Sequence, residues 1–277
     1  MATDSPRPAR IAALNVYPVK SCRGVALDRA RITATGFEHD REWLIVQRDG
    51  RFITQREEPR LALIETALTP EGLKLSAPGV AALSVPYDAV AAEIEVVIWK
   101  DRCAAFDTGD GAAAWLQAFL GKALRLVRFD PRRRRPSDPV WTDGMEALNY
   151  FSDAFPWLVI SQGSLDDLNA RLPTPLPMNR FRPNIVIDGV APYAEDGARE
   201  ISIDGVRFAP VKACTRCAIT TTDQKRGERD GEEPLRTLRQ YRFDRELKGV
   251  VFGQNLILIE GLGREIRVGQ DAALLPR

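Results

Sequence analysis

Hydrophobic and polar positions alternate in short runs along the first 100 residues. Trp43 to Gln47 and Phe52 to Gln55 flank Asp49-Gly50, a dipeptide that favours a tight hairpin turn because both residues tolerate positive φ. More short apolar runs follow, separated by Pro and Gly: Leu61 to Thr66, Leu73 to Leu75 and Ile94 to Trp99. This pattern predicts short β-strands over most of this part of the chain.

Helical spacing occurs in three places. Ala112 to Leu120 has Trp115, Leu116, Phe119 and Leu120 on one face, at intervals of three and four residues, which predicts an amphipathic helix. Ser164, followed by Asp167 three residues later, predicts a second helix that begins at Ser164 as in a capping box. Pro234 predicts a third, short helix, since proline is tolerated in a first turn.

The second half otherwise resembles the first. We expect strands at Phe155 to Ser161, Asn184 to Ile187, Glu200 to Ile203, Val206 to Val211, Val250 to Phe252 and Leu256 to Ile259. Many strands with few helices predict a β-rich α+β fold, with barrel-like or sandwich packing rather than a doubly wound sheet.

Composition and charge limit the classes of protein to which the chain can belong. The chain has 277 residues, 44% hydrophobic and 28% charged, with a net charge of +1, which is typical of a globular protein with one large or two moderate domains. A neutral chain has no overall field to attract nucleic acid or anionic membrane. The start, Met1 to Arg10, is polar, and no run approaches the roughly 18 apolar residues of a membrane helix. We therefore expect a soluble, cytoplasmic protein.

A run of four arginines, Arg132 to Arg135, lies between Pro131 and Pro136. Proline at both ends and repulsion between like charges predict an exposed loop or a linker between domains. A contact to nucleic acid is the alternative, but the neutral charge of the whole chain favours a solvated charge run.

The cysteines limit the possible metal sites. The chain has four cysteines and one histidine, His39, which lies between two acidic residues and is expected to be exposed without a catalytic role. Four cysteines do not form a disulfide framework in a chain of this length. A structural zinc site needs about four ligands in paired clusters, and only one pair is closely spaced. A thioredoxin-type site is disfavoured, because Ala218 to Thr222 is β-branched and predicts extended backbone.

That close pair is Cys214-Thr215-Arg216-Cys217. A neighbouring guanidinium lowers the pKa of a thiol, and the thiolate is the nucleophile or metal ligand; the alternative for Cys217 is a small, inert, buried hydrophobic residue. Three basic, close-turned segments accompany the pair: Tyr17-Pro18-Val19-Lys20-Ser21-Cys22, Asp40-Arg41-Glu42-Trp43 and Asn179-Arg180-Phe181-Arg182-Pro183-Asn184. One soft ligand with several cations suggests a site for a large anionic metal cofactor.

Ordered motifs along nearly the whole chain extend this hypothesis. They are Tyr17-Pro18-Val19-Lys20-Ser21, Asp40-Arg41 with Trp43, Gln55-Arg56-Glu57, Phe181-Arg182-Pro183-Asn184, Cys214-Thr215-Arg216-Cys217 and Phe252-Gly253-Gln254. With these motifs the chain resembles the MOSC family, and within it the mitochondrial amidoxime-reducing components and their bacterial relatives. The resemblance implies an N-terminal MOSC-associated β-barrel domain at 1–130 and a MOSC β-barrel domain with a few peripheral helices at 131–277.

The resemblance also implies a cofactor and its ligands. Cys217 is expected to bind the metal of the molybdenum cofactor beside the dithiolene of molybdopterin, since thiolate is a soft ligand. Cys214 is either a packing thiol or a second ligand. Arginine suits the cofactor phosphate because its planar fork holds two oxygens. The expected cofactor contacts are Lys20, Ser21, Arg41, Arg182 and Asn184.

Function follows from the same resemblance. We expect a molybdenum-dependent reductase of N-hydroxylated compounds, namely amidoximes, hydroxylamines and N-hydroxylated bases, in which Asp153 positions or protonates the leaving oxygen or is only a turn aspartate. The chain ends without the cysteines of a fused iron–sulfur domain, so electrons are expected from a separate ferredoxin- or cytochrome-type protein. The alternative is a carrier module, in which Cys217 bears a persulfide or holds the cofactor for delivery.

Overall fold

The computed structural model describes residues 9–277, so most of the polar start at Met1 to Arg10 lies outside the described residues. The first half of the chain is made mainly of strands. Its elements are β1 (Arg10–Val16), β2 (Val25–Leu27), β3 (Arg29–Thr33), β4 (Gly36–Phe37), β5 (Trp43–Gln47), β6 (Glu65–Leu68), β7 (Gly72–Ala77), β8 (Val80–Pro86), β9 (Ala92–Ile98), β10 (Asp101–Asp107), α1 (Asp110–Leu120) and β11 (Leu124–Phe129).

The second half adds more strands and three helices. Its elements are α2 (Pro139–Thr142), β12 (Trp157–Ser161), α3 (Gln162–Arg171), β13 (Ile185–Asp188), β14 (Ala198–Ile203), β15 (Val206–Thr215), β16 (Thr222–Asp223), β17 (Glu228–Arg229), α4 (Leu235–Tyr241), β18 (Phe243–Asp244), β19 (Gly249–Glu260), β20 (Glu265–Arg267) and β21 (Ala273–Pro276). The prediction of a β-rich α+β fold with a few helices is confirmed. No helix within residues 9–277 has the length and apolar character needed to cross a bilayer.

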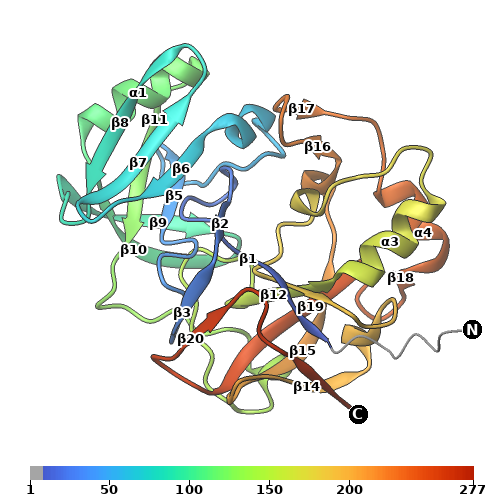
Figure 1. Ribbon diagram of the computed structural model, residues 1–277. Coiled ribbons are helices and arrows are strands. Elements are labelled where there is room, and N and C mark those ends of the chain that lie inside the picture. The colour runs from blue at the N-terminus through green and yellow to red at the C-terminus, as the bar shows by residue number, and fades with distance from the viewer. Residues whose placement is uncertain (1–8) are drawn as a thin grey trace, which may run out of the picture.

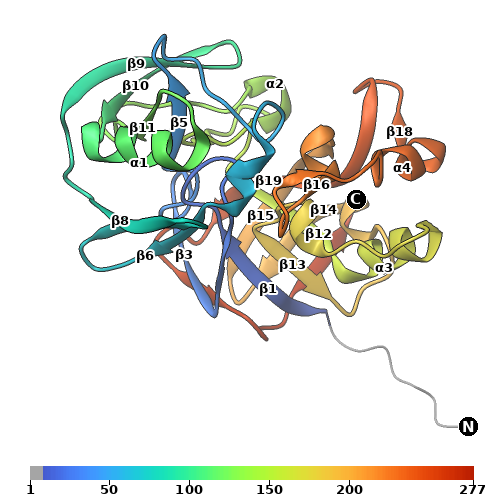
Figure 2. The ribbon, with the colours of Figure 1, turned by 90° about the horizontal axis from the view of Figure 1, so that it is seen from above.

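The largest sheet combines strands from both halves of the chain. Its order is β2-β1-β13-β12-β19-β15-β14-β21, and Figures 1 and 2 show β1 beside the strands of the second half, apart from the lobe that carries α1. In this sheet β1 pairs antiparallel with β13, whereas β3 pairs antiparallel with β20 in a separate three-stranded sheet, β20-β3-β4. β1 and β2 therefore complete a sheet whose central strands come from the second half.

Two of the hydrophobic clusters support this arrangement. In the larger sheet, Trp157 and Phe208 meet edge to face with ring centroids 5.3 Å apart, and both are almost fully buried. In the other lobe, Trp115, Leu116 and Phe119 of α1 pack into a core with strand residues such as Ile45 and Leu126. The helical face predicted from spacing is thus the face that is buried.

Asp-Gly lies in the turns at Asp49-Gly50 and Asp204-Gly205. The turn at Asp49-Gly50 forms, but the predicted strand at Phe52 to Gln55 is wrong, since only isolated bridges form there, one of which pairs Phe52 with Val46. Gly50 has φ of +80°, and an added Cβ would lie 2.7 Å from the Glu95 carbonyl oxygen, so only glycine fits there. Asp204 and Gly205 both have positive φ in the turn that joins β14 to β15, where Ile203 pairs with Val206. Such turns match the twist of the strands that they connect.

Several local predictions were wrong at their boundaries. The helix predicted at Ser164 is capped by Ser161, whose side chain accepts from the Ser164 amide. The predicted strand at Leu61 to Thr66 begins as a 3-10 turn, Pro59–Leu63, and Ala218–Thr221 is a 3-10 turn rather than extended. The two closing strands are one, β19. In each case hydrogen bonds of a turn or sheet outweigh local propensity.

The arginine run is also less uniform than predicted. Arg132, Arg133 and Arg134 are exposed, but Arg135 is only 8% exposed. Its guanidinium pairs with Asp101 and donates to the carbonyl oxygen of Ser152 at 2.8 Å. The last arginine of the run therefore anchors the loop that leads to Asp153.

Candidate functional site

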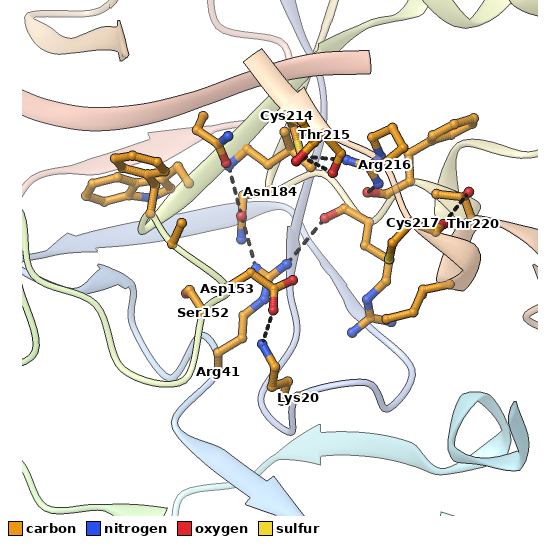
Figure 3. A pocket seen from close by; sticks show the side chains of 18 of the residues that line it. Lys20, Arg41, Ser152, Asp153, Asn184, Cys214, Thr215, Arg216, Cys217 and Thr220 are labelled. Carbon is orange, nitrogen blue, oxygen red and sulfur yellow. Dashed lines mark hydrogen bonds and ion pairs between the residues drawn. The ribbon is translucent and has the colours of Figure 1, made fainter. Parts of the chain in front are cut away.

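All seven side chains predicted for the site line one pocket (Figure 3). They are Lys20, Ser21, Arg41, Asp153, Arg182, Asn184 and Cys217, and they share the pocket with Ser152, Cys214, Arg216, Thr220 and others. Lys20 and Arg41 come from the first half of the chain, whereas Asp153, Arg182 and Cys217 come from the second. The pocket therefore lies where the two halves meet.

Three of these residues have left-handed backbone conformations. Ser21, Arg41 and Arg182 have φ of 68°, 49° and 58°, a region that non-glycine residues seldom occupy. Such strain persists only where surrounding contacts fix it, and it concentrates at functional sites. The turns direct these side chains into the pocket.

The ring of Tyr17 holds two of the arginines together. The guanidinium carbons of Arg41 and Arg182 each lie 4.2 Å from the centroid of this ring, within the range of cation–π attraction. Burial lowers the pKa of Arg182 to about 10, with repulsion from Arg41 adding to the effect, so Arg182 remains charged at neutral pH. Two like charges side by side form a site for an anion.

Hydrogen bonds fix the directions of these arginines. Arg41 donates to Asn184 Oδ1 at 3.0 Å and also pairs with the buried carboxylate of Asp40. Arg182 donates to the Cys22 carbonyl oxygen at 2.7 Å. Asn184 is 1% exposed and its amide donates to the Asn15 carbonyl oxygen. Asn184 is thus a support for Arg41 as well as a pocket residue.

Lys20 and Asp153 form an ion pair at the pocket. Lys20 Nζ lies 2.7 Å from Asp153 Oδ1, and the Asp153 side chain is 61% exposed. Surrounding protein raises the pKa of Asp153 by desolvation, but the charge and hydrogen bond of Lys20 outweigh this and lower it. Desolvation is the largest single effect, but the charges of Lys20 and Arg56 and the hydrogen bonds from Lys20 and Trp99 together exceed it. Asp153 is therefore ionised at neutral pH.

The guanidinium next to Cys217 is not the one expected. Arg56 Nη2 donates to Cys217 Sγ at 3.0 Å, whereas Arg216 Nη1 donates to Cys214 Sγ at 2.9 Å. Burial raises the pKa of Cys214 despite Arg216, so Cys214 is held as a neutral thiol. Cys217 lies just beyond β15, which ends at Thr215, and directly before the 3-10 turn Ala218–Thr221. Its carbonyl oxygen accepts from the Thr220 amide at 3.0 Å.

The charges of the pocket fit an anionic, thiolate-bound cofactor. Four cations line it, Lys20, Arg41, Arg182 and Arg216, against the single lining carboxylate of Asp153. Arg216 also has a buried Nε without a partner in the described residues, and an unpaired buried donor is costly. Bound phosphate or pterin oxygens are suitable acceptors, so these residues suit the molybdenum cofactor.

Sequence reasoning did not identify Arg56 or Trp99 as site residues. Trp99 Nε1 donates to Asp153 Oδ1 at 3.0 Å, and the Arg56 guanidinium stacks on the Trp99 ring at 4.8 Å from its centroid. Arg56 lies in the Gln55-Arg56-Glu57 motif, which indicated only the fold. His39, expected to be exposed, stacks on Tyr87 and contacts Glu42.

Comparison with known proteins covers most of the chain. Residues 8–123 match the MOSC N-terminal beta barrel domain, and residues 148–272 match the MOSC domain. Mitochondrial amidoxime-reducing component 1 of Mus musculus is 38% identical over 280 residues, and that of Homo sapiens is 38% identical over 283; each match spans 96% of this chain and 82% of the relative. Mitochondrial amidoxime reducing component 2 of Bos taurus is 36% identical over 244 residues, with 84% and 72% covered.

Proposed function

Because the chain belongs to the MOSC family, in the branch that contains the mitochondrial amidoxime-reducing components, we propose that it reduces N-hydroxylated compounds. The substrates are amidoximes, hydroxylamines and N-hydroxylated bases. Each turnover converts an N–OH group, two electrons and two protons into N–H and water. The observation that carries the proposal is a single pocket that gathers Cys217, Asp153 and four cations.

The proposed cofactor is the molybdenum cofactor. Cys217 would bind the metal, while Lys20, Ser21, Arg41, Arg182 and Asn184 would hold the phosphate and the pterin. When bound, the cofactor supplies the two-electron chemistry, and the protein supplies orientation and electrostatics. Arg56, which donates to Cys217 Sγ, would tune the ligand, since hydrogen bonds to a ligating atom adjust the metal site.

Asp153 is proposed to orient the substrate. Lys20 Nζ and Trp99 Nε1 both donate to its Oδ1, so Oδ2 can accept a hydrogen bond from the N–OH or amino group of a substrate. Because the pKa of Asp153 is lowered, the group is a carboxylate at neutral pH. This supports the role of positioning over the role of proton donor.

The remaining partners are proposed on chemical grounds. A reduction by two electrons requires a donor, and we propose a separate protein of ferredoxin or cytochrome type. Nucleic acid is not a proposed partner, because Arg132 and Arg133 pair with Asp130, Arg134 pairs with Glu146, and Arg135 pairs with Asp101. A cytoplasmic location stays a prediction.

One experiment on purified protein tests the function. Molybdenum and pterin are quantified, and benzamidoxime is then offered with a viologen reduced by dithionite. The proposal expects about one molybdenum per chain and stoichiometric formation of benzamidine. Molybdenum without turnover, or a persulfide on Cys217 that cyanide releases as thiocyanate, supports the carrier alternative and contradicts the reductase.

A further inference from the structure

Trp99 has an unusual conformation in the turn that joins β9 to β10. Its φ is 54° and its surface is 48% exposed. A bulky residue with left-handed backbone is a true outlier, and a large aromatic ring open to water loses the stability that burial gives. Trp99 thus combines a strained backbone with an exposed aromatic ring. Strain of this kind is a reason to look for function.

The contacts of Trp99 connect it to the two reactive groups of the pocket. Its Nε1 donates to Asp153 Oδ1 at 3.0 Å. Its ring stacks with the guanidinium of Arg56, which in turn donates to Cys217 Sγ at 3.0 Å. Phe52 meets the ring edge to face, with centroids 5.1 Å apart. The indole is thus fixed beside Asp153 and is connected to the candidate metal ligand Cys217 through Arg56.

A fixed, partly open indole is a surface for stacking. Planar π systems pack on aromatic faces and gain stability beyond the area that they bury, whereas a saturated chain gains only burial. A substrate whose N–OH group approaches Asp153 Oδ2 would extend over the ring that donates to Oδ1. Amidoximes and N-hydroxylated bases are planar and conjugated, so this geometry suits them.

We infer that Trp99 is a substrate-positioning residue that gives the pocket a preference for planar, conjugated N-hydroxylated compounds over saturated alkyl hydroxylamines. The inference rests on the reductase function proposed above. It assigns two tasks to one side chain: the ring receives the substrate, and Nε1 holds the Asp153 carboxylate in place.

The test compares two substrates in cofactor-loaded protein. The quantity measured is the ratio of kcat/KM for benzamidoxime to kcat/KM for N-butylhydroxylamine, with reduced viologen as donor. Trp99→Asn removes the ring and suits a left-handed turn, since asparagine tolerates positive φ. It is expected to lower the ratio about tenfold, the effect of one lost stacking contact.

Two further variants separate a specific role from a structural one. Trp99→Phe keeps an aromatic ring and is expected to change the ratio by less than about threefold. Lys100→Asn alters the exposed neighbour in the same turn and is expected to leave the ratio unchanged. Equal losses for both substrates in Trp99→Asn, or no loss, overturn the inference. Absence of turnover with either substrate in the loaded wild type overturns the reductase function and the inference together.

Discussion

The ammonium of Lys20 joins the two halves of the chain through Asp153. Lys20 Nζ donates to Asp153 Oδ1 at 2.7 Å and to the Phe151 carbonyl oxygen at 2.8 Å. Burial lowers the pKa of Lys20, and the charge of Asp153 opposes this change. The lysine is buried and the aspartate is exposed, so the pair presents a fixed carboxylate to the pocket.

Replacement of this lysine should change the titration of Asp153. In Lys20→Met the charge and hydrogen bond that lower the pKa of Asp153 are lost, so the pKa rises. In the wild type the ionised Asp153 contributes stability above its unfolded pKa of about 3.9, and that contribution is lost as the pH falls through the lower folded value. Titration of the carboxyl carbon by NMR measures the shift, and an unchanged pKa contradicts the assignment. Lys100→Met is the control.

The two neighbouring cysteines should differ in metal binding. Cys217→Ala is expected to lose molybdenum and activity, because it removes the proposed thiolate ligand. Cys214→Ala is expected to retain most of its molybdenum, since Cys214 is a neutral thiol bonded to Arg216. Metal analysis and thermal unfolding check both variants, and melting temperatures close to that of the wild type show that the fold is intact. Retained metal in Cys217→Ala means that the wrong cysteine is assigned.

Alkylation should also distinguish the cysteines of the cofactor-free protein. Burial raises the pKa of Cys22 to about 12 and that of Cys103 to about 11, so neither forms appreciable thiolate at pH 8. Cys217 lines the pocket and is partly exposed. Iodoacetamide at pH 8, followed by peptide mass spectrometry, is therefore expected to modify Cys217 well before Cys22 or Cys103. Faster labelling of Cys22 contradicts the burial described above.

Loss of one arginine should weaken cofactor retention. Arg182→Asn removes a cation from the pocket while keeping a residue that tolerates positive φ. A charge-assisted hydrogen bond is worth about 1.5–3 kcal/mol, so we expect cofactor affinity to fall about tenfold or more. Pterin content after dialysis measures this. Arg171→Asn, on the exposed surface of α3, is the control, and equal pterin in both variants places Arg182 outside the binding set.

The larger core should be sensitive to truncation of one aromatic ring. Phe208 is fully buried and meets Trp157 edge to face, so Phe208→Ala is expected to lower the free energy of unfolding by about 3–5 kcal/mol. Phe243→Ala, at a residue that is 44% exposed, is expected to cost much less. Urea unfolding of both variants gives the comparison, and similar losses contradict the packing.

Local sequence patterns predicted which helices and strands form better than they predicted which strands pair. The face of α1, the Asp49-Gly50 turn and the buried strand β12 follow from spacing within a few residues. The pairing of β1 with β13 joins residues about 170 positions apart, and no local pattern carries that information. The helix was predicted to begin at Ser164 but is capped by Ser161. Either serine could serve as an N-cap, and only the folded structure determines which one does.

The residues of the site could be predicted from the sequence for a different reason. Its seven residues were expected from motifs of a known family, and the structure brings them into one pocket, while their roles stay proposals. Arg56 and Trp99 were not identified, because their importance depends on contacts with Cys217 and Asp153 that are distant in sequence. A guanidinium next to a thiol in the sequence, Arg216, was assigned to Cys217 but contacts Cys214.

The pairing of β1 with β13 and of β3 with β20 restricts how this protein can be divided. A C-terminal fragment that begins near residue 130 would lack β1. Its strand β13 would then be an open edge with unpaired backbone donors and acceptors, and such edges promote aggregation. Exchange of halves between relatives would have to keep the matching strands together. The pocket, whose lining side chains come from both halves, therefore depends on the whole chain.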